Sequence, residues 1–176
     1  MSSYYTYFIS SLPMLQFGSK PALTLKDFLN RCAEFIPRKD AALIKEALST
    51  DGYALQVSVP VALLKWREFD LALRNELVKA RALRKKVDPA GFLRNDTYFD
   101  MKITHIAQAA LRHTSVLEAE RYLDLQRWNV LDEISRGHYF DLDFLLVYGL
   151  KLAILERWAK IEAADKAGLL EKAIPN

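Results

Sequence analysis

The most apolar stretch of the chain is residues 144–155, in which all faces but one are hydrophobic. A helix of this kind belongs in a core, where each large side chain contributes roughly 1.5–3 kcal/mol on burial before the entropy of ordering is subtracted. We predict that it is the second arm of a helical hairpin over residues 114–163. Thr114 or Ser115 is expected to cap the first arm and Asp141 the second. The apolar face of the first arm comprises Val116, Ala119, Leu123, Val130 and Ile134.

A second apolar stripe, with steps of three and four residues, predicts a long helix from Pro60 to about Lys86. Its other faces are charged, and Asp70 with Arg74 forms an i,i+4 pair that stabilises by a few tenths of a kcal/mol when exposed. Residues 88–91 end this helix. The stripe comprises Ala62, Trp66, Phe69, Leu73, Leu77, Ala80 and Leu83.

Three shorter helices are predicted from cap residues and apolar spacing. Thr24, with Asp27 in the first turn, caps a helix over residues 25–36. Two more are expected over residues 39–48 and 101–112. The predicted inward positions are Leu25, Phe28, Leu29, Cys32 and Phe35 in the first of the three and Ile103, Ile106, Ala107 and Ala110 in the last.

Two segments are less definite. Residues 4–12 fit a strand, because aromatic and β-branched residues favour strands, but also one face of a helix. Residues 53–59 alternate as a strand does, and form an extended loop unless they pair with the first segment. Because every other periodic segment is helical, the predicted fold class is all-α: a single-domain helical bundle, residues 1–176, with a long C-terminal helical hairpin.

Composition narrows the class of protein further. A hydrophobic fraction of 51% with 27% charged residues, over 176 residues, is typical of one globular domain. Cys32 is the only cysteine, which excludes an intrachain disulfide and favours a reducing compartment. No basic residue precedes the apolar N-terminal segment, and the longest apolar run, about 12 residues, contains Lys151, whereas a membrane span needs roughly 20. We expect a cytoplasmic protein.

Motifs for catalysis, metal binding or nucleotide binding are not evident. The three histidines are eight and twenty-five residues apart, too far for two imidazoles on adjacent helical turns, and the six glycines form no phosphate-binding loop. The adjacent acids Asp132 and Glu133 point apart on a helix. We therefore predict no catalytic residue, no cofactor, no metal and no small-molecule substrate.

Basic and aromatic side chains provide the candidate contact residues. The basic end of the long helix suits the negative end of the helix dipole as a solvated terminus; otherwise it meets an acidic partner, an anionic lipid surface or, least of all, nucleic acid. Tyrosines near the N-terminus suit protein contacts, although such clusters are more often core. The candidate partner-contact residues are Tyr4, Tyr5, Arg67, Lys79, Arg81, Arg84, Lys85 and Lys86.

Several segments, in their joint order, resemble an uncharacterised protein family encoded with bacterial vacuolar-type (V-type) ATP synthase subunits. The segments are residues 4–13, Trp66-Arg67-Glu68-Phe69, Arg74-Asn75-Glu76-Leu77 with Arg81, residues 127–133, His138-Tyr139-Phe140-Asp141 and residues 151–158. The family is distantly similar to the helical socket subunit of the central stalk, called d in eukaryotes, which lies between the rotor shaft and the membrane ring. It has no motif of known function and so assigns no role to a residue.

The resemblance implies a non-catalytic subunit or accessory protein of a V-type ATP synthase, supporting ATP-coupled proton or sodium transport. Its partners would be the rotor shaft or the membrane ring, with no nucleic acid, and it would lie in the cytoplasm, peripheral to the inner membrane through those partners. Alternatives are an assembly factor for that complex and, from another class, a basic helical nucleic-acid-binding or enzyme domain.

Overall fold

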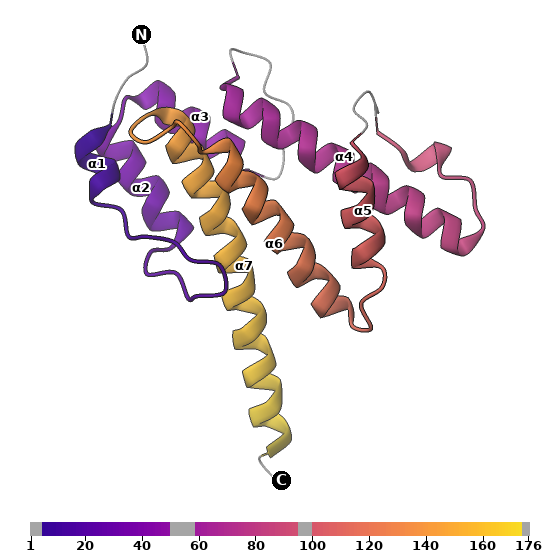
Figure 1. Ribbon diagram of the computed structural model, residues 1–176. Helices are drawn as coiled ribbons and strands as arrows, with labels where there is room; N and C mark the ends of the chain where they lie inside the picture. Colours follow the sequence, from indigo (N-terminus) through magenta and orange to yellow (C-terminus); the bar gives the residue numbers. More distant parts are fainter. Residues whose placement is uncertain (1–4, 50–58, 95–99, 174–176) are drawn as a thin grey trace. The chain divides into compact units, whose positions relative to one another are not determined.

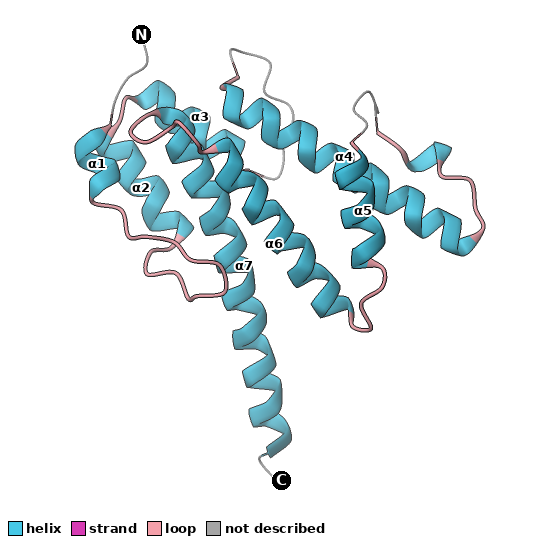
Figure 2. Cartoon of the chain, viewed as in Figure 1, coloured by secondary structure: helices cyan, strands magenta, loops and turns pink. Residues whose placement is uncertain are grey.

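The computed structural model describes residues 5–49, 59–94 and 100–173. In this part of the chain every regular element is a helix (Figure 2), which confirms the predicted all-α class. The elements are α1 (Thr6–Ser10), α2 (Leu25–Phe35), α3 (Arg38–Ala47), α4 (Val61–Lys85), the 3-10 turn η2 (Ala90–Phe92), α5 (Met101–Ala110), α6 (Val116–Ile134) and α7 (Leu142–Ala173).

The chain divides into two compact units, which are described separately. Unit 1 comprises residues 1–58 and 137–176, and unit 2 comprises residues 59–136. Unit 1 therefore contains α1, α2, α3 and α7, whereas unit 2 contains α4, η2, α5 and α6. The single domain over residues 1–176 stays a prediction.

Unit 1 is built around the first half of α7, against which α2 and α3 pack (Figure 1). The prediction that this apolar helix is buried is confirmed: Leu145 and Leu152 are fully buried. Thr24 caps α2 as expected, because its Oγ1 accepts a hydrogen bond of 3.1 Å from the Asp27 amide. From α7, Glu156 Oε1 accepts a hydrogen bond of 2.5 Å from the Leu25 amide, so a carboxylate lies at the positive end of α2.

Unit 2 packs α4 against α5 and α6. Their shared apolar core comprises Phe69, Ala72, Leu73, Leu77, Ile103, Ala107, Ala110 and Leu123. Beside it, Arg127 of α6 lies 2.9 Å from the Asp124 carboxylate and 3.5 Å from that of Asp70 on α4. The predicted i,i+4 pair of Asp70 with Arg74 is confirmed, with Arg74 Nε 2.8 Å from Asp70 Oδ2, and Asp70, like Asp124, is buried.

Three residues predicted to face inward are exposed. Phe35 is 48% exposed, Leu83 82% and Val116 81%. Each lies at or near an end of its helix, and beyond Leu77 the last turns of α4 have a buried apolar side chain only at Ala82. Periodicity identifies an apolar face, but it does not show where the neighbouring helix stops covering that face.

The remaining sequence predictions concern boundaries. The ambiguous N-terminal segment is helical at α1, with Phe8 and Ile9 buried. Helix α7 continues to Ala173 instead of ending near residue 163. The alternating residues 53–59 fall, apart from Val59, outside the described residues.

Candidate functional site

Of the two predicted contact tyrosines, the structure describes Tyr5. Tyr4 lies outside the described residues, and Tyr5 is buried in unit 1. The Tyr5 hydroxyl donates a hydrogen bond to Asp40 Oδ2, and its backbone amide donates one of 2.6 Å to the Phe140 carbonyl. Tyr5 therefore joins the N-terminal segment to α3 and to the turn before α7.

The aromatic surface of this region is formed by Tyr7 and Phe35 instead. Tyr7 is 81% exposed, and the centroid of its ring lies 6.4 Å from that of Phe35. The Phe35 ring in turn stacks on buried Phe8 at 5.6 Å. The two exposed rings are thus supported from below by the core of unit 1.

Two of the predicted basic residues lie away from the end of α4. Arg67 is half-buried. Lys79 is also half-buried and lies 2.8 Å from Glu76 Oε1, while Glu76 Oε2 accepts a hydrogen bond of 2.9 Å from the Thr104 hydroxyl of α5. Lys79 therefore belongs to a polar link between α4 and α5.

The other four basic candidates are brought together at the end of α4, in a region we call the α4 tip, residues 81–94. All four are exposed: Arg81, Arg84, Lys85 and Lys86. Large apolar side chains lie among them, with Leu83 82%, Val87 52% and Phe92 70% exposed. The α4 tip thus presents cationic and apolar groups together.

Local backbone structure fixes the shape of the α4 tip. Lys86 adopts a left-handed conformation (φ 55°) that ends the helix, and the Val87 amide then donates a hydrogen bond of 3.1 Å to the Ala82 carbonyl. Farther on, buried Asn75 holds the Arg94 backbone: its Nδ2 donates to the Arg94 carbonyl (2.6 Å), and its Oδ1 accepts from the Arg94 amide (3.1 Å). The chain after α4 therefore returns along the last turns of the helix (Figure 1).

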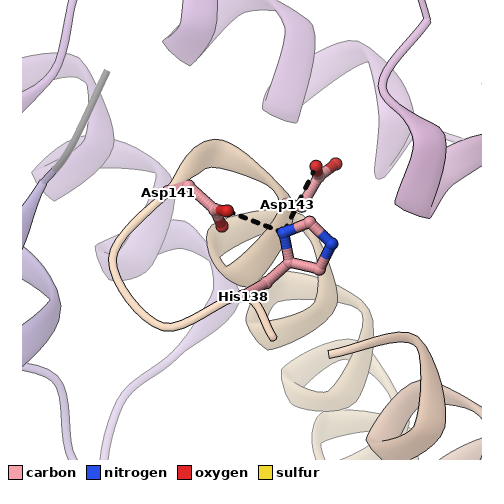
Figure 3. A group of neighbouring side chains, drawn as sticks. All are labelled: His138, Asp141 and Asp143. Atoms are coloured by element: carbon pink, nitrogen blue, oxygen red, sulfur yellow. Dashed lines mark hydrogen bonds and ion pairs between the residues drawn. The ribbon is translucent and has the colours of Figure 1, made fainter. Parts of the chain in front are cut away.

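A second group of functional side chains lies at the start of α7. His138 Nδ1 lies 2.6 Å from Asp141 Oδ2 and 3.6 Å from Asp143 Oδ2 (Figure 3). One ligand atom from each of the three residues falls within 4.8 Å of the others, and all three side chains are half-buried. An imidazole and two carboxylates are a donor set that divalent transition metals accept.

The geometry of this group is also that of a helix cap. Asp141 Oδ1 accepts a hydrogen bond of 3.0 Å from the Phe144 amide, which confirms the predicted cap, and the other oxygen contacts the imidazole. The positive end of the helix dipole favours these carboxylates and disfavours a cation beside them. We therefore interpret the group as a cap whose orientation His138 fixes. Sequence analysis identified Asp141 but not the His-x-x-Asp-x-Asp spacing that brings the three together.

Unit 2 also contains a cavity of about 690 Å³, within the size range of ligand pockets. Apolar side chains such as Phe69 and Ile106 alternate around it with groups of both charges, including Glu68, Glu133 and Lys102. No pattern in the sequence indicated it, because its walls come from three helices. Its mixed charges do not concentrate one sign that would select a class of ligand.

In the described residues, these observations define a helical protein that exposes aromatic side chains at Tyr7 and Phe35 and basic with apolar side chains at the α4 tip. Residues 98–174 match the model of a family described as "Protein of unknown function (DUF2764)". The match covers α5, α6 and α7, while α1 to α4 lie outside it. No curated protein and no solved structure matches the chain. Among the helices searched in the described part, none has both the length and the hydropathy needed to cross a bilayer.

Proposed function

We propose that this chain is a non-catalytic subunit or accessory protein of a bacterial V-type ATP synthase, similar in role to the socket subunit of the central stalk. In this proposal it lies in the cytoplasm, peripheral to the inner membrane, and binds the rotor shaft or the membrane ring through helical surfaces. It contributes to ATP-coupled ion transport by transmitting force between subunits, and it makes or breaks no bond itself.

The observation that carries the proposal is the ordered set of sequence segments that resemble the family encoded with these subunits. Several of the segments lie on long helices: residues 66–69 and 74–77 on α4, residues 127–133 on α6 and residues 151–158 on α7. The last two fall within the residues that match the family model.

The shape of unit 1 supports a mechanical role. Helix α7 has 32 residues, which corresponds to a length of about 48 Å at 1.5 Å per residue. Its first half is buried among α2 and α3, and its second half extends beyond them (Figure 1). From Lys160 to Asp165 no described side chain is buried. A helix anchored at one end that extends beyond its neighbours at the other suits a component that contacts a shaft.

The aromatic surface of Tyr7 and Phe35 supports a protein contact in the same unit. Exposed aromatic side chains that rest on a packed core are typical anchors of protein interfaces, where removal of one often costs more than 1 kcal/mol. We therefore expect these two rings to contribute to binding of the neighbouring subunit.

A purification through a tag on this chain, from detergent-solubilised membranes of a bacterium that contains the V-type enzyme, tests the proposal. We expect co-recovery of the shaft or ring subunits, and at least a tenfold loss of that recovery in the double variant Tyr7→Ser/Phe35→Ser. The matched control is Met14→Ser, which alters an equally accessible apolar side chain (93% exposed) elsewhere in unit 1.

The outcomes separate the hypotheses. Recovery of fully assembled enzyme supports a subunit, whereas recovery of incomplete subcomplexes alone assigns the chain to assembly. If no subunit of the enzyme is recovered with the unaltered chain, the proposal is wrong. Circular dichroism of the variants checks that the helices are retained.

A further inference from the structure

The positive charge of the protein is concentrated in the α4 tip. Its 14 residues contain five basic side chains and one acidic one, Asp88, so the segment carries +4 although the whole chain carries +3. The five basic residues are exposed, and within the described residues no ion pair is seen at Arg81, Arg84 or Lys85. These charges are therefore available to an anionic surface.

The apolar side chains of the α4 tip are exposed on a backbone that is held in place. Leu83 lies in the last turns of α4, and Val87 and Phe92 lie in the segment that returns along them. Because the left-handed Lys86 and the two Asn75 hydrogen bonds fix both ends of that segment, exposure of these groups is a property of the folded state. Large apolar groups kept in water beside a cationic cluster indicate a binding surface.

We propose that the α4 tip binds an anionic lipid membrane directly. The α4 tip has 14 residues, of which Ala82 is buried, whereas a stable protein interface contains about 20–30 residues on each partner. A bilayer surface deforms around such a tip. Leu83, Val87 and Phe92 would enter the interfacial region, and the basic side chains around them would lie at the level of the phosphates.

The combination of charge and apolar groups sets the expected strength of binding. Each basic side chain near an anionic membrane strengthens binding about fivefold, and this attraction extends over roughly one Debye length. Removing three of them should weaken binding on the order of 100-fold. Raising the ionic strength from about 0.1 M to about 1 M, which shortens the Debye length from about 10 Å to about 3 Å, should also release the protein.

Cosedimentation of the purified full-length chain with lipid vesicles tests this proposal. The vesicles contain phosphatidylcholine with or without phosphatidylglycerol, so that only the anionic headgroup differs. We expect binding to the anionic vesicles at low salt, a loss on the order of 100-fold in Arg81→Gln/Arg84→Gln/Lys85→Gln, and a loss of about tenfold in Leu83→Ser/Phe92→Ser.

The matched control variants carry the same kinds of substitution at positions outside the α4 tip. Arg38→Gln/Lys39→Gln/Lys45→Gln removes the same charge from exposed positions of unit 1, and Met101→Ser/Val116→Ser removes two exposed apolar groups elsewhere in unit 2. Both should bind as the unaltered chain does. Thermal melts establish that each variant is folded before it is compared.

Three outcomes would overturn the proposal. The first is absence of binding to the anionic vesicles, and the second is equal loss in the tip variants and their matched controls. The third is binding to soluble polyglutamate without binding to vesicles, which would assign the α4 tip to an acidic protein. The assay contains no other polypeptide, so its result is independent of membership in an ATP synthase.

Discussion

At the scale of single residues, Gly149 shows how closely unit 1 is packed. A Cβ atom at this position would lie 2.7 Å from Leu48 Cδ1 and 3.1 Å from Phe28 Cε1. Phe28 is fully buried and its ring lies 5.2 Å from that of Tyr148, so it has little room to move. The glycine lets the α7 backbone approach α2 and the end of α3.

We predict that Gly149→Ala lowers the free energy of unfolding by about 1–3 kcal/mol, because overpacking outweighs the gain of about 1 kcal/mol in helix propensity. The matched control is Gly91→Ala, since no atom lies within 4 Å of the corresponding Cβ position and the change should stay within about 0.5 kcal/mol. Urea unfolding measures both. Equal stability of the two variants would contradict the packing described for α7.

Two buried titratable groups in unit 1 make its stability depend on alkaline pH. Burial raises the pKa of the Cys32 thiol from 9.0 to about 12. Burial also raises the pKa of Tyr148 from 10.0 to about 12, although the positive charge of Arg31 lowers it in part. The Tyr148 hydroxyl donates a hydrogen bond of 2.8 Å to the Pro13 carbonyl, which requires the protonated form.

In both cases the unfolded chain loses its proton at a lower pH than the folded chain, so stability should be constant below about pH 9 and fall between pH 9 and 12. We expect a loss on the order of 2 kcal/mol by about pH 10.5. Urea unfolding at pH 8 and at about pH 10.5 measures this loss of unfolding free energy. Compared with the unaltered chain, the loss should be smaller in Cys32→Ala/Tyr148→Phe and the same in the exposed control Tyr7→Phe. If the unaltered chain and both variants lose the same unfolding free energy between these pH values, neither buried group causes the pH dependence.

At the scale of elements, the contacts made at the helix ends determine which side chains are exposed. The end of α4 is the main example, because beyond Leu77 only Ala82 of this helix is buried. Beyond this point, the shape of the chain depends on the Asn75 amide and the left-handed Lys86. Neither is visible in hydrophobic periodicity, since one is a polar residue on a buried face and the other is a non-glycine residue in a conformation that favours glycine.

We predict that Asn75→Ala lowers the stability of unit 2 by about 1–3 kcal/mol, because it leaves the Arg94 backbone groups without their side-chain partner. Amide hydrogen exchange in residues 86–94 should become faster, while exchange in the core of α6 should change less. Asn129→Ala, at an exposed position of α6, is the control and should alter neither quantity. Unchanged exchange in residues 86–94 would mean that Asn75 does not hold this segment.

The elements themselves could be predicted well from sequence, and the reasons are physical. Thr24, Ser115 and Asp141 each accept a hydrogen bond from an amide in the first turn of the helix they were expected to cap. The long helix after Pro60 ends within one residue of its predicted terminus. Caps and periodicity depend on residues close together in the sequence, so they can be recognised without knowledge of the tertiary structure.

The candidate sites were less predictable because they depend on contacts between distant residues. The group at the start of α7 requires the turn that folds His138 back onto Asp141, and the Tyr7–Phe35 surface joins α1 to α2. The basic residues of the α4 tip were found from their charge alone, but Lys79 could be separated from them only through its contact with Glu76. Burial of Tyr5 likewise depends on Asp40, which is 35 residues away.

At the scale of the whole molecule, each of the two units combines a packed helical core with exposed groups for which we propose a binding role. Unit 1 carries the aromatic pair and the projecting half of α7, and unit 2 carries the α4 tip. The family-model match includes helices from both units, so it does not coincide with either one. We infer that the two surfaces serve different partners: a neighbouring polypeptide for unit 1 and an anionic membrane for unit 2.

We propose that this chain is a component of a bacterial V-type ATP synthase. The most direct test is quantitative mass spectrometry of the enzyme isolated from native membranes through a different subunit. We expect the chain to be present at a fixed ratio to the rotor shaft and to remain so through successive purification steps. Its absence from preparations that contain every other subunit at full ratio would show that it is not a subunit of the enzyme.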